Sequence, residues 1–140
     1  MPVEQILESR WPSGDSTWLF GLKLRVHELA HSLGLAVNEW EEDGLGLQRG
    51  MLLRLETGRV ILVSESPHAI EYLGSKGASV EVDAYEAAEL GFEALATEVT
   101  TQLGLSNDHV VIVPADLQTW RQEAADRAAW AKQRRRPRGS

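Results

Sequence analysis

The chain has 140 residues, of which 43% are hydrophobic and 25% charged, a length and composition typical of a single globular domain. It contains no cysteine, which excludes disulfides and thiolate metal ligands. The formal net charge is −7, but five of the 14 basic residues lie together near the C-terminus: Lys132, Arg134, Arg135, Arg136 and Arg138. The other nine basic residues stand against 21 acidic ones, which leaves residues 1–131 at −12 and disfavours binding to nucleic-acid phosphates.

A helical pattern covers residues 15–35, and Asp15 or Ser16 provides its N-cap. His27 and His31 are four residues apart, so they share one helix face, nearly opposite the apolar stripe. The stripe is formed by Trp18, Leu22, Val26, Leu29 and Leu33.

The HELAH string at residues 27–31 has a spacing that suits zinc. Two imidazoles one helical turn apart, His27 and His31, can ligate one ion. Glu28, between them, can act as a general base on a metal-bound water. This pattern indicates metal-assisted hydrolysis.

Residues 27–35 resemble the helix motif HExxHxxGxxH of the metzincin metalloproteases, and Gly34 matches the glycine of that motif. The resemblance implies a zinc hydrolase with the two histidines as ligands and the glutamate as catalytic base. The third histidine of the family falls at Val37, which cannot bind metal. Because a catalytic zinc normally has three protein ligands, another residue must complete the set. The candidates are Glu39, Glu41, Glu42, Asp43, His68 and His109.

Residues 2–9, before this helix, form either one helical turn or an arm. After the helix, β-branched and apolar runs separated by turn residues predict a series of strands. Gly58 takes the left-handed position of a hairpin turn between two of them. The predicted strands are 36–40, a second that begins at residue 47 or 51 and ends at 56, 59–64, 69–73 and 78–82.

A second long helix is predicted from Asp83, its N-cap, to residue 103, where a glycine follows. A short apolar strand comes next, at residues 109–113. A last helix begins at Ala115 or Asp116 and ends in basic residues that complement its dipole.

The order α-β-β-β-β-α-β-α predicts the α+β class. We expect a two-layer sandwich in which a mostly antiparallel sheet of about five strands packs against three helices. Residues 1–131 form the single domain, and residues 132–140 are a basic tail expected to be disordered. The interior is expected to collect Leu22, Val26, Leu29, Leu33, Leu53, Leu62, Phe92, Leu95, Val99 and Ile112.

The leading functional hypothesis is a non-catalytic, acidic protein-binding module that engages a basic protein partner. In size, acidity and lack of cysteine the chain resembles bacterial immunity proteins and antitoxins, and the resemblance implies a toxin-neutralising role. One alternative is the zinc hydrolase. The other is a self-associating structural domain, a homodimer that buries Phe20, Leu24 and Trp130.

The predicted partner-binding residues are an acidic turn and one tryptophan, Glu41, Glu42, Asp43 and Trp130. The leading hypothesis needs no cofactor, whereas the hydrolase alternative needs zinc. The sequence has no apolar run long enough for a membrane span and no signal-peptide pattern, so we expect a cytoplasmic protein that binds no membrane and no nucleic acid through its acidic body.

Overall fold

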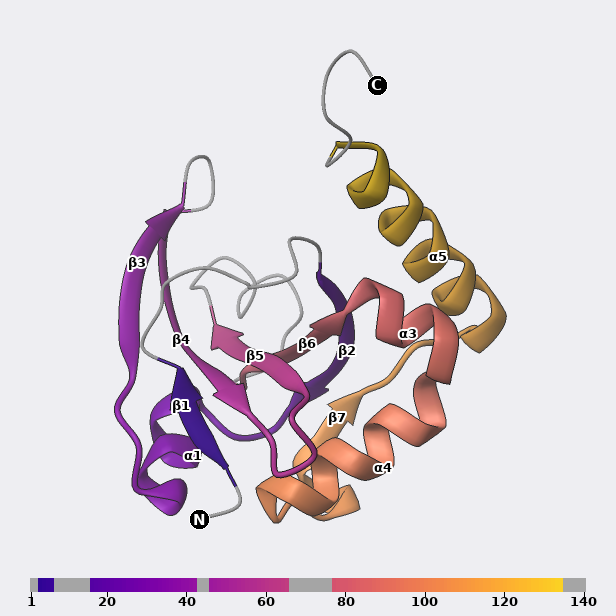
Figure 1. The fold of residues 1–140 in the computed structure, drawn as a ribbon. Coiled ribbons are helices and arrows are strands. Elements are labelled where there is room, and N and C mark those ends of the chain that lie inside the picture. The colour runs from indigo at the N-terminus through magenta and orange to yellow at the C-terminus, as the bar shows by residue number, and fades with distance from the viewer. Residues whose placement is uncertain (1–2, 7–15, 43–45, 66–76, 135–140) are drawn as a thin grey trace.

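The computed structural model describes residues 3–6, 16–42, 46–65 and 77–134. Seven strands form one antiparallel sheet that packs against helices, which confirms the α+β class (Figure 1). The strands are β1 (Glu4–Ile6), β2 (Ser16–Leu22), β3 (Asn38–Glu42), β4 (Gly46–Arg54), β5 (Val60–Glu65), β6 (Ser79–Asp83) and β7 (Val110–Ile112). The described residues form four α-helices where three were predicted: α1 (Val26–Leu33), α3 (Ala84–Leu90), α4 (Phe92–Leu103) and α5 (Leu117–Arg134). A short 3-10 helix, η1 (Asn107–His109), precedes β7.

The strand order across the sheet is β1-β4-β5-β6-β2-β7, and β3 also pairs with β4. β5 pairs with one side of β4, and β1 and β3 follow one another along the other side. β1 pairs with the end of β4, where Glu4 lies opposite Arg54, and β3 pairs with its start, where Asn38 lies opposite Gly50. The two short strands β1 and β3 thus together cover the same side of β4.

Gln5 joins these two short strands. Its side-chain Nε2 donates to the carbonyl of Ala36 at 2.5 Å, and its Oε1 accepts from the Ala36 N–H at 3.2 Å. Residues 2–9, expected to be a helical turn or an arm, therefore include the paired edge strand β1. The side chain of Gln5 joins this strand by hydrogen bonds to the segment that leads into β3.

The helix predicted over residues 15–35 is wrong in its first half, because residues 16–22 form the strand β2 and the helix begins only at Val26. Trp18 and Leu22 are four residues apart, a spacing that places them on one face of either a helix or a strand. The partners of β2 decide the matter. β6 and β7 lie far along the sequence and pair with it on both sides, and no local pattern reveals them.

The second predicted helix is broken in two at Gly91. This glycine has a φ of 83°, in the left-handed region that a continuous right-handed helix does not contain. Its N–H still bonds to the Ala87 carbonyl at 3.0 Å and ends α3, and α4 begins at the next residue. The N-cap prediction is confirmed, because the Asp83 carboxylate accepts the N–H of Glu86 at 3.2 Å.

The strand predictions fared better than the first helix. The hairpin of β4 and β5 is confirmed, with Gly58 at a φ of 91° in its turn. β3, β6, β7 and the last helix are also found near their predicted places. Asp116 caps that helix by accepting the N–H groups of Gln118 and Thr119. The strand predicted at 69–73 and the tail from residue 135 lie outside the described residues.

The core lies between the helices and one face of the sheet. Leu62 is only half-buried, because its neighbours Ile61 and Val63 point to the helix-covered face and side chains alternate along a strand. Leu33 and Phe92 are also half-buried, and the side chain of Ile112 is not described. The predicted core residues that are buried are Leu22, Val26, Leu29, Leu53, Leu95 and Val99.

Trp120 fixes α5 to the rest of the molecule. Its Nε1 donates to the carbonyl of Trp18, in the first half of β2, at 2.6 Å. Its ring meets that of Phe92 edge-on, with centroids 5.7 Å apart and planes at 83°. Arg121 adds hydrogen bonds to two carbonyls in the last turn of α3. These contacts of Trp120 and Arg121 anchor the first half of the long helix.

Candidate functional site

The HELAH string lies on α1, as predicted, and His27, Glu28 and His31 are exposed. Gly34 has a φ of 70° and ends the helix in the left-handed conformation of a C-cap. The two imidazoles share the outer surface of the helix, because its inner side is buried in the core through Val26, Leu29 and Ala30.

Glu28 holds the start of α1. Its Oε1 accepts the backbone N–H of Arg25 at 2.9 Å, as the third residue of a helix does in a capping box. A general base must direct a lone pair at the water that it activates. In the observed geometry one oxygen of Glu28 is occupied by the helix terminus instead.

A third metal ligand is not found among the described residues, because none of their His, Asp and Glu side chains form a group of three that could hold an ion. Glu39 is paired with Arg49 at 3.1 Å. Nδ1 of His109 accepts the N–H of Ser106 at 3.0 Å, within η1.

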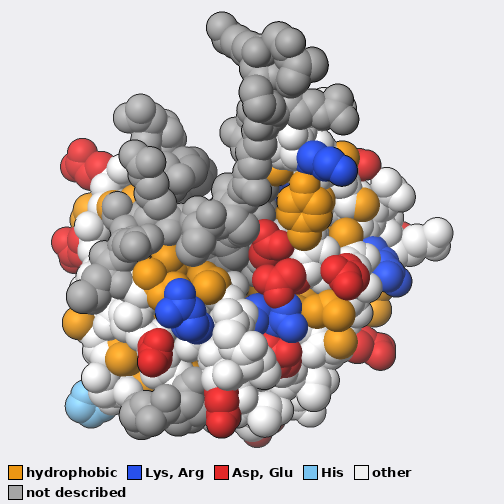
Figure 2. Space-filling model, viewed as in Figure 1, with side chains coloured by type: hydrophobic (Ala, Val, Ile, Leu, Met, Phe, Trp, Pro, Cys, Tyr) orange, Lys and Arg blue, Asp and Glu red, His pale blue; other side chains and the backbone are white. Residues whose placement is uncertain are grey.

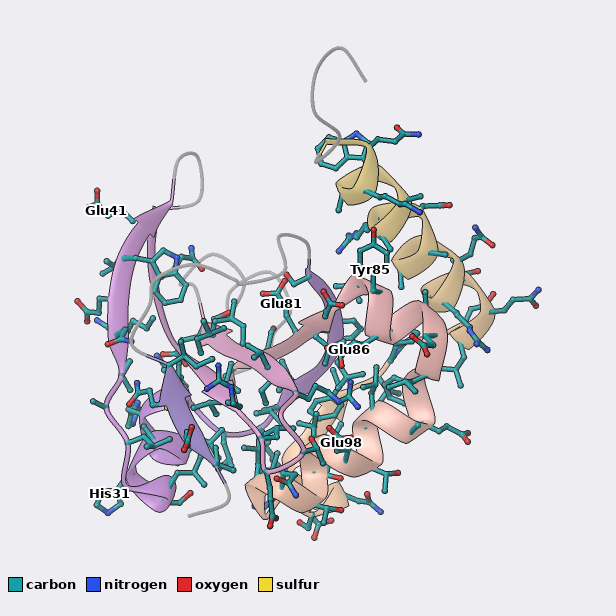
Figure 3. The ribbon with its side chains drawn as sticks, in the orientation of Figure 1. His31, Glu41, Glu81, Tyr85, Glu86 and Glu98 are labelled. Carbon is teal, nitrogen blue, oxygen red and sulfur yellow. The ribbon has the colours of Figure 1, made fainter. Side chains whose placement is uncertain are left out.

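One of the remaining candidates, Glu41, lies far from the histidine pair. Figure 3 shows His31 and Glu41 at opposite ends of one side of the molecule, so they do not converge. The other three candidate ligands are Asp43 and His68, which lie outside the described residues, and Glu42, whose side chain does too.

A buried ion pair connects the start of α1 to the end of β5. The Glu65 carboxylate accepts two hydrogen bonds from Arg25, both at 2.9 Å, and one from the Val26 N–H at 3.2 Å. Its side chain is 2% exposed, against 35% for Arg25. Burial alone would raise the pKa of Glu65, but these hydrogen bonds and the charges of Arg25 and His27 hold it below its usual value. The hydrogen bond to Glu65 raises the pKa of Arg25 in turn.

A second ionic cluster ties the β4–β5 turn to the helices. Arg59 donates to the Glu98 carboxylate from Nε at 2.5 Å and from Nη2 at 3.1 Å, and it also pairs with Glu86. The Thr57 hydroxyl donates to Glu98 at 3.0 Å. The hydrogen bond from Arg59 lowers the pKa of Glu98 although partial burial opposes it. Figure 3 shows the two glutamates on the same side of the molecule, one on α3 and one on α4.

Sequence reasoning missed both clusters. Arg25 and Glu65 are 40 residues apart, and Arg59 and Glu98 are 39 apart, so no local spacing connects them. The one signal is that a carboxylate, Glu65, ends a strand of mainly apolar residues. A charge in such a position is normally paired when the strand is central. Both clusters link elements that are distant in the sequence.

The predicted partner-binding residues are not gathered into one patch. Glu41 is exposed on β3, and Glu42 belongs to the same strand. Asp43 lies outside the described residues. Trp130 is 56% exposed in the second half of α5. Figure 1 shows β3 and α5 on opposite sides of the molecule, so the acidic strand and this tryptophan belong to separate surfaces.

The described arginines are mostly engaged within the molecule. Beside the two clusters, Arg49 pairs with Glu39 and Arg54 with Glu4, and Arg127 donates to the carbonyl of Ser16. Figure 2 shows acidic side chains on the visible face and along its margins, with basic ones beside several of them. The exposed acidic residues whose side chains form neither an ion pair nor a hydrogen bond with another described residue are Glu41, Glu56, Glu89, Glu93, Asp108 and Glu123.

A comparison with protein-family models, curated proteins and solved structures finds no match. Among the described helices, none has the length and apolar character needed to cross a membrane.

Proposed function

We propose that this chain is a non-catalytic binding module that engages a basic protein partner. The observation that supports it is the imbalance of exposed charge. Four arginines, at positions 25, 49, 54 and 59, are paired with carboxylates of the same chain, while six exposed acidic side chains have neither an ion-pair nor a hydrogen-bond partner among the described residues. The remaining field at the surface is therefore negative.

A negative field of this kind favours one class of partner. It attracts basic proteins over long distances and raises the rate at which they meet the chain, by about 10-fold or more at low salt. It repels nucleic acids and other acidic proteins. In size and charge the chain resembles immunity proteins and antitoxins, so a basic toxin in the cytoplasm is the kind of partner that we propose.

The proposal is tested by capture. The full chain is immobilised and exposed to lysate of the source organism at roughly 50 mM and roughly 500 mM salt, which differ in screening length by about threefold. We expect a basic protein to be retained at low salt and released at high salt. A matched bait carries lysine at Glu89, Glu93 and Glu123 and must retain the same circular dichroism spectrum.

This charge-reversed bait is expected to retain much less of the basic protein. Equal retention by both baits, or retention of chaperones alone, would contradict the proposal. Because the three substituted side chains are exposed and unpaired within the described residues, their reversal changes the surface field with little effect on packing.

The zinc alternative draws on one observation, the exposed pair of His27 and His31 on one side of α1. Two imidazoles are one ligand short of a catalytic site. In the self-association alternative, Phe20 cannot form part of the dimer interface, because it is 1% exposed in the core. The half-buried Leu24 and the exposed Trp130 are the interface residues that remain. Sedimentation at several concentrations tests this alternative directly.

A further inference from the structure

β3 is an edge strand with one side open. Within the described residues it pairs with β4 alone, from Asn38 opposite Gly50 to Glu42 opposite Gly46. Figure 1 shows β3 at the margin of the molecule with no labelled element outside it. In an antiparallel edge strand, alternate backbone N–H and C=O groups point away from the sheet and remain free to pair with another chain.

The side chains of β3 restrict which chain can pair there. Glu39 and Glu41 share one face of the strand and are exposed, and Trp40 lies on the other face, half-buried, opposite Gln48. Glu39 is paired with Arg49, whereas Glu41 has no ion-pair partner among the described residues. If a second copy of β3 paired with this edge, glutamates would face glutamates, which destabilises a sheet.

The same charges favour a strand of opposite sign. Lysine or arginine at alternate positions of an incoming strand would face Glu39 and Glu41, and the positions between would lie beside Trp40, which suits apolar or cationic side chains. The β3 edge therefore selects among incoming strands by their charge on one face and by their contact with Trp40 on the other.

We propose that β3 is the docking edge for an extended segment of a different protein, rich in lysine and arginine, that adds to the sheet as an antiparallel strand. This inference rests on the proposed function and deepens it, because it assigns the recognition surface and the conformation of the basic partner. Strand addition gives affinity through backbone hydrogen bonds and specificity through alternate side chains. β3 has five residues, so the docked segment has about the same length.

The test uses a short peptide of alternating lysine and valine, acetylated and amidated at its ends, titrated into the ¹⁵N-labelled full chain at low salt. The largest amide shifts are expected within residues 38–42. Glu41→Lys is expected to weaken the affinity about fivefold, because one favourable cross-strand charge pair becomes repulsive. The matched control is Glu123→Lys on α5, which changes the net charge equally and is expected to weaken binding by less than about twofold.

Two further measurements separate strand addition from general charge attraction. The same peptide methylated at every backbone nitrogen keeps its charge but loses its hydrogen-bond donors, and it is expected not to bind. Glu41→Gln is expected to fall between the parent and Glu41→Lys, and urea unfolding establishes that both variants remain folded.

Equal weakening by Glu41→Lys and Glu123→Lys, undiminished binding of the methylated peptide, or largest amide shifts that lie away from β3 would each overturn the inference. Concentration-dependent dimerisation of the parent chain, with its largest amide shifts in residues 38–42, would identify the occupant as a second copy and overturn it too. These failures are distinct from that of the proposed function. If a basic protein is captured from lysate but Glu41→Lys leaves its retention unchanged, the proposed function stands and the docking edge is wrong.

Discussion

Glu65 shows how much one carboxylate can hold together. It is almost fully buried, it accepts two hydrogen bonds from Arg25, and it accepts the first free N–H of α1. A buried charge is tolerated only when its partners are in place, and removal of one partner leaves the other uncompensated. The end of β5 and the start of α1 are therefore coupled through this side chain.

Replacing Glu65 by Gln is expected to lower the free energy of unfolding by about 2 kcal/mol. The figure is below that for a wholly buried pair because Arg25 is 35% exposed and partly screened by water. The measurement is urea denaturation followed by circular dichroism. Glu56→Gln, at an exposed position in the hairpin turn, is the matched control and should change the free energy by less than about 0.5 kcal/mol.

Zinc binding at the histidine pair makes an equally local prediction. With two imidazoles on an exposed helix face, we expect the chelator-treated chain to take up zinc weakly and to lose it on dialysis. His27→Ala should remove this weak uptake, and His109→Ala should not. Elemental analysis showing one zinc per chain that survives dialysis and disappears in His27→Ala would instead support the hydrolase alternative.

At the scale of elements, two glycines illustrate different constraints. Gly77 is buried where the chain enters β6, next to Ala78, whose backbone is hydrogen-bonded to Leu22 and Leu24. A Cβ atom at this position would overlap the backbone carbonyl of Leu22, which cannot move without breaking β2. Gly58 has space around it but a φ of 91°.

Gly77→Ala is accordingly expected to cost about 3 kcal/mol, since it forces two backbone segments apart. Gly58→Ala should cost about 1 kcal/mol, the penalty of a left-handed conformation for an L-residue. Urea midpoints of the two variants, measured side by side, check the order. An equal loss at the two sites would show that the backbone around Gly77 adapts.

The elements that sequence reasoning predicted correctly are those specified by neighbouring residues. The β4–β5 hairpin follows from a turn glycine between two apolar runs, and α5 follows from Asp116 as a cap. β2 was missed because its partners are distant, and the break at Gly91 was missed because the apolar stripe continues across it from Ala88 to Phe92. A single glycine inside a helical pattern is weak local evidence.

The candidate site divides in the same way. The helix carrying His27 and His31 was predicted from local spacing, and α1 does carry them on its exposed side. Whether a third ligand stands beside them depends on tertiary placement, which local spacing does not contain. The ion pairs of Arg25 and Arg59 depend on tertiary placement too, and both were missed.

At the scale of the whole molecule, the ionic clusters make stability depend on pH. The folded state holds the pKa values of Glu65 and Glu98 below their ordinary value of 4.5. A carboxyl group whose pKa is lower when folded contributes stability that is fully present above the unfolded pKa. That contribution is lost as the pH falls through the folded value.

We therefore expect the free energy of unfolding to decline as the pH is lowered from about 5 to about 2. The double variant Glu65→Gln, Glu98→Gln should be less stable at neutral pH and show a flatter decline. Thermal unfolding across this range compares the two proteins. Parallel curves would mean that other carboxyl groups govern acid denaturation.

The central place of β2 has a consequence for synthesis. Leu19, Phe20 and Leu22 are at most 1% exposed in the finished sheet, but the strands that flank them, β6 and β7, follow much later in the chain. A ribosome translates β2 long before it reaches either neighbouring strand. The nascent chain therefore exposes an apolar segment whose partner strands, β6 and β7, have not yet been made. Stalled chains that end before β6 are expected to be cut by protease within β2, and released full-length chains are expected to be protected there.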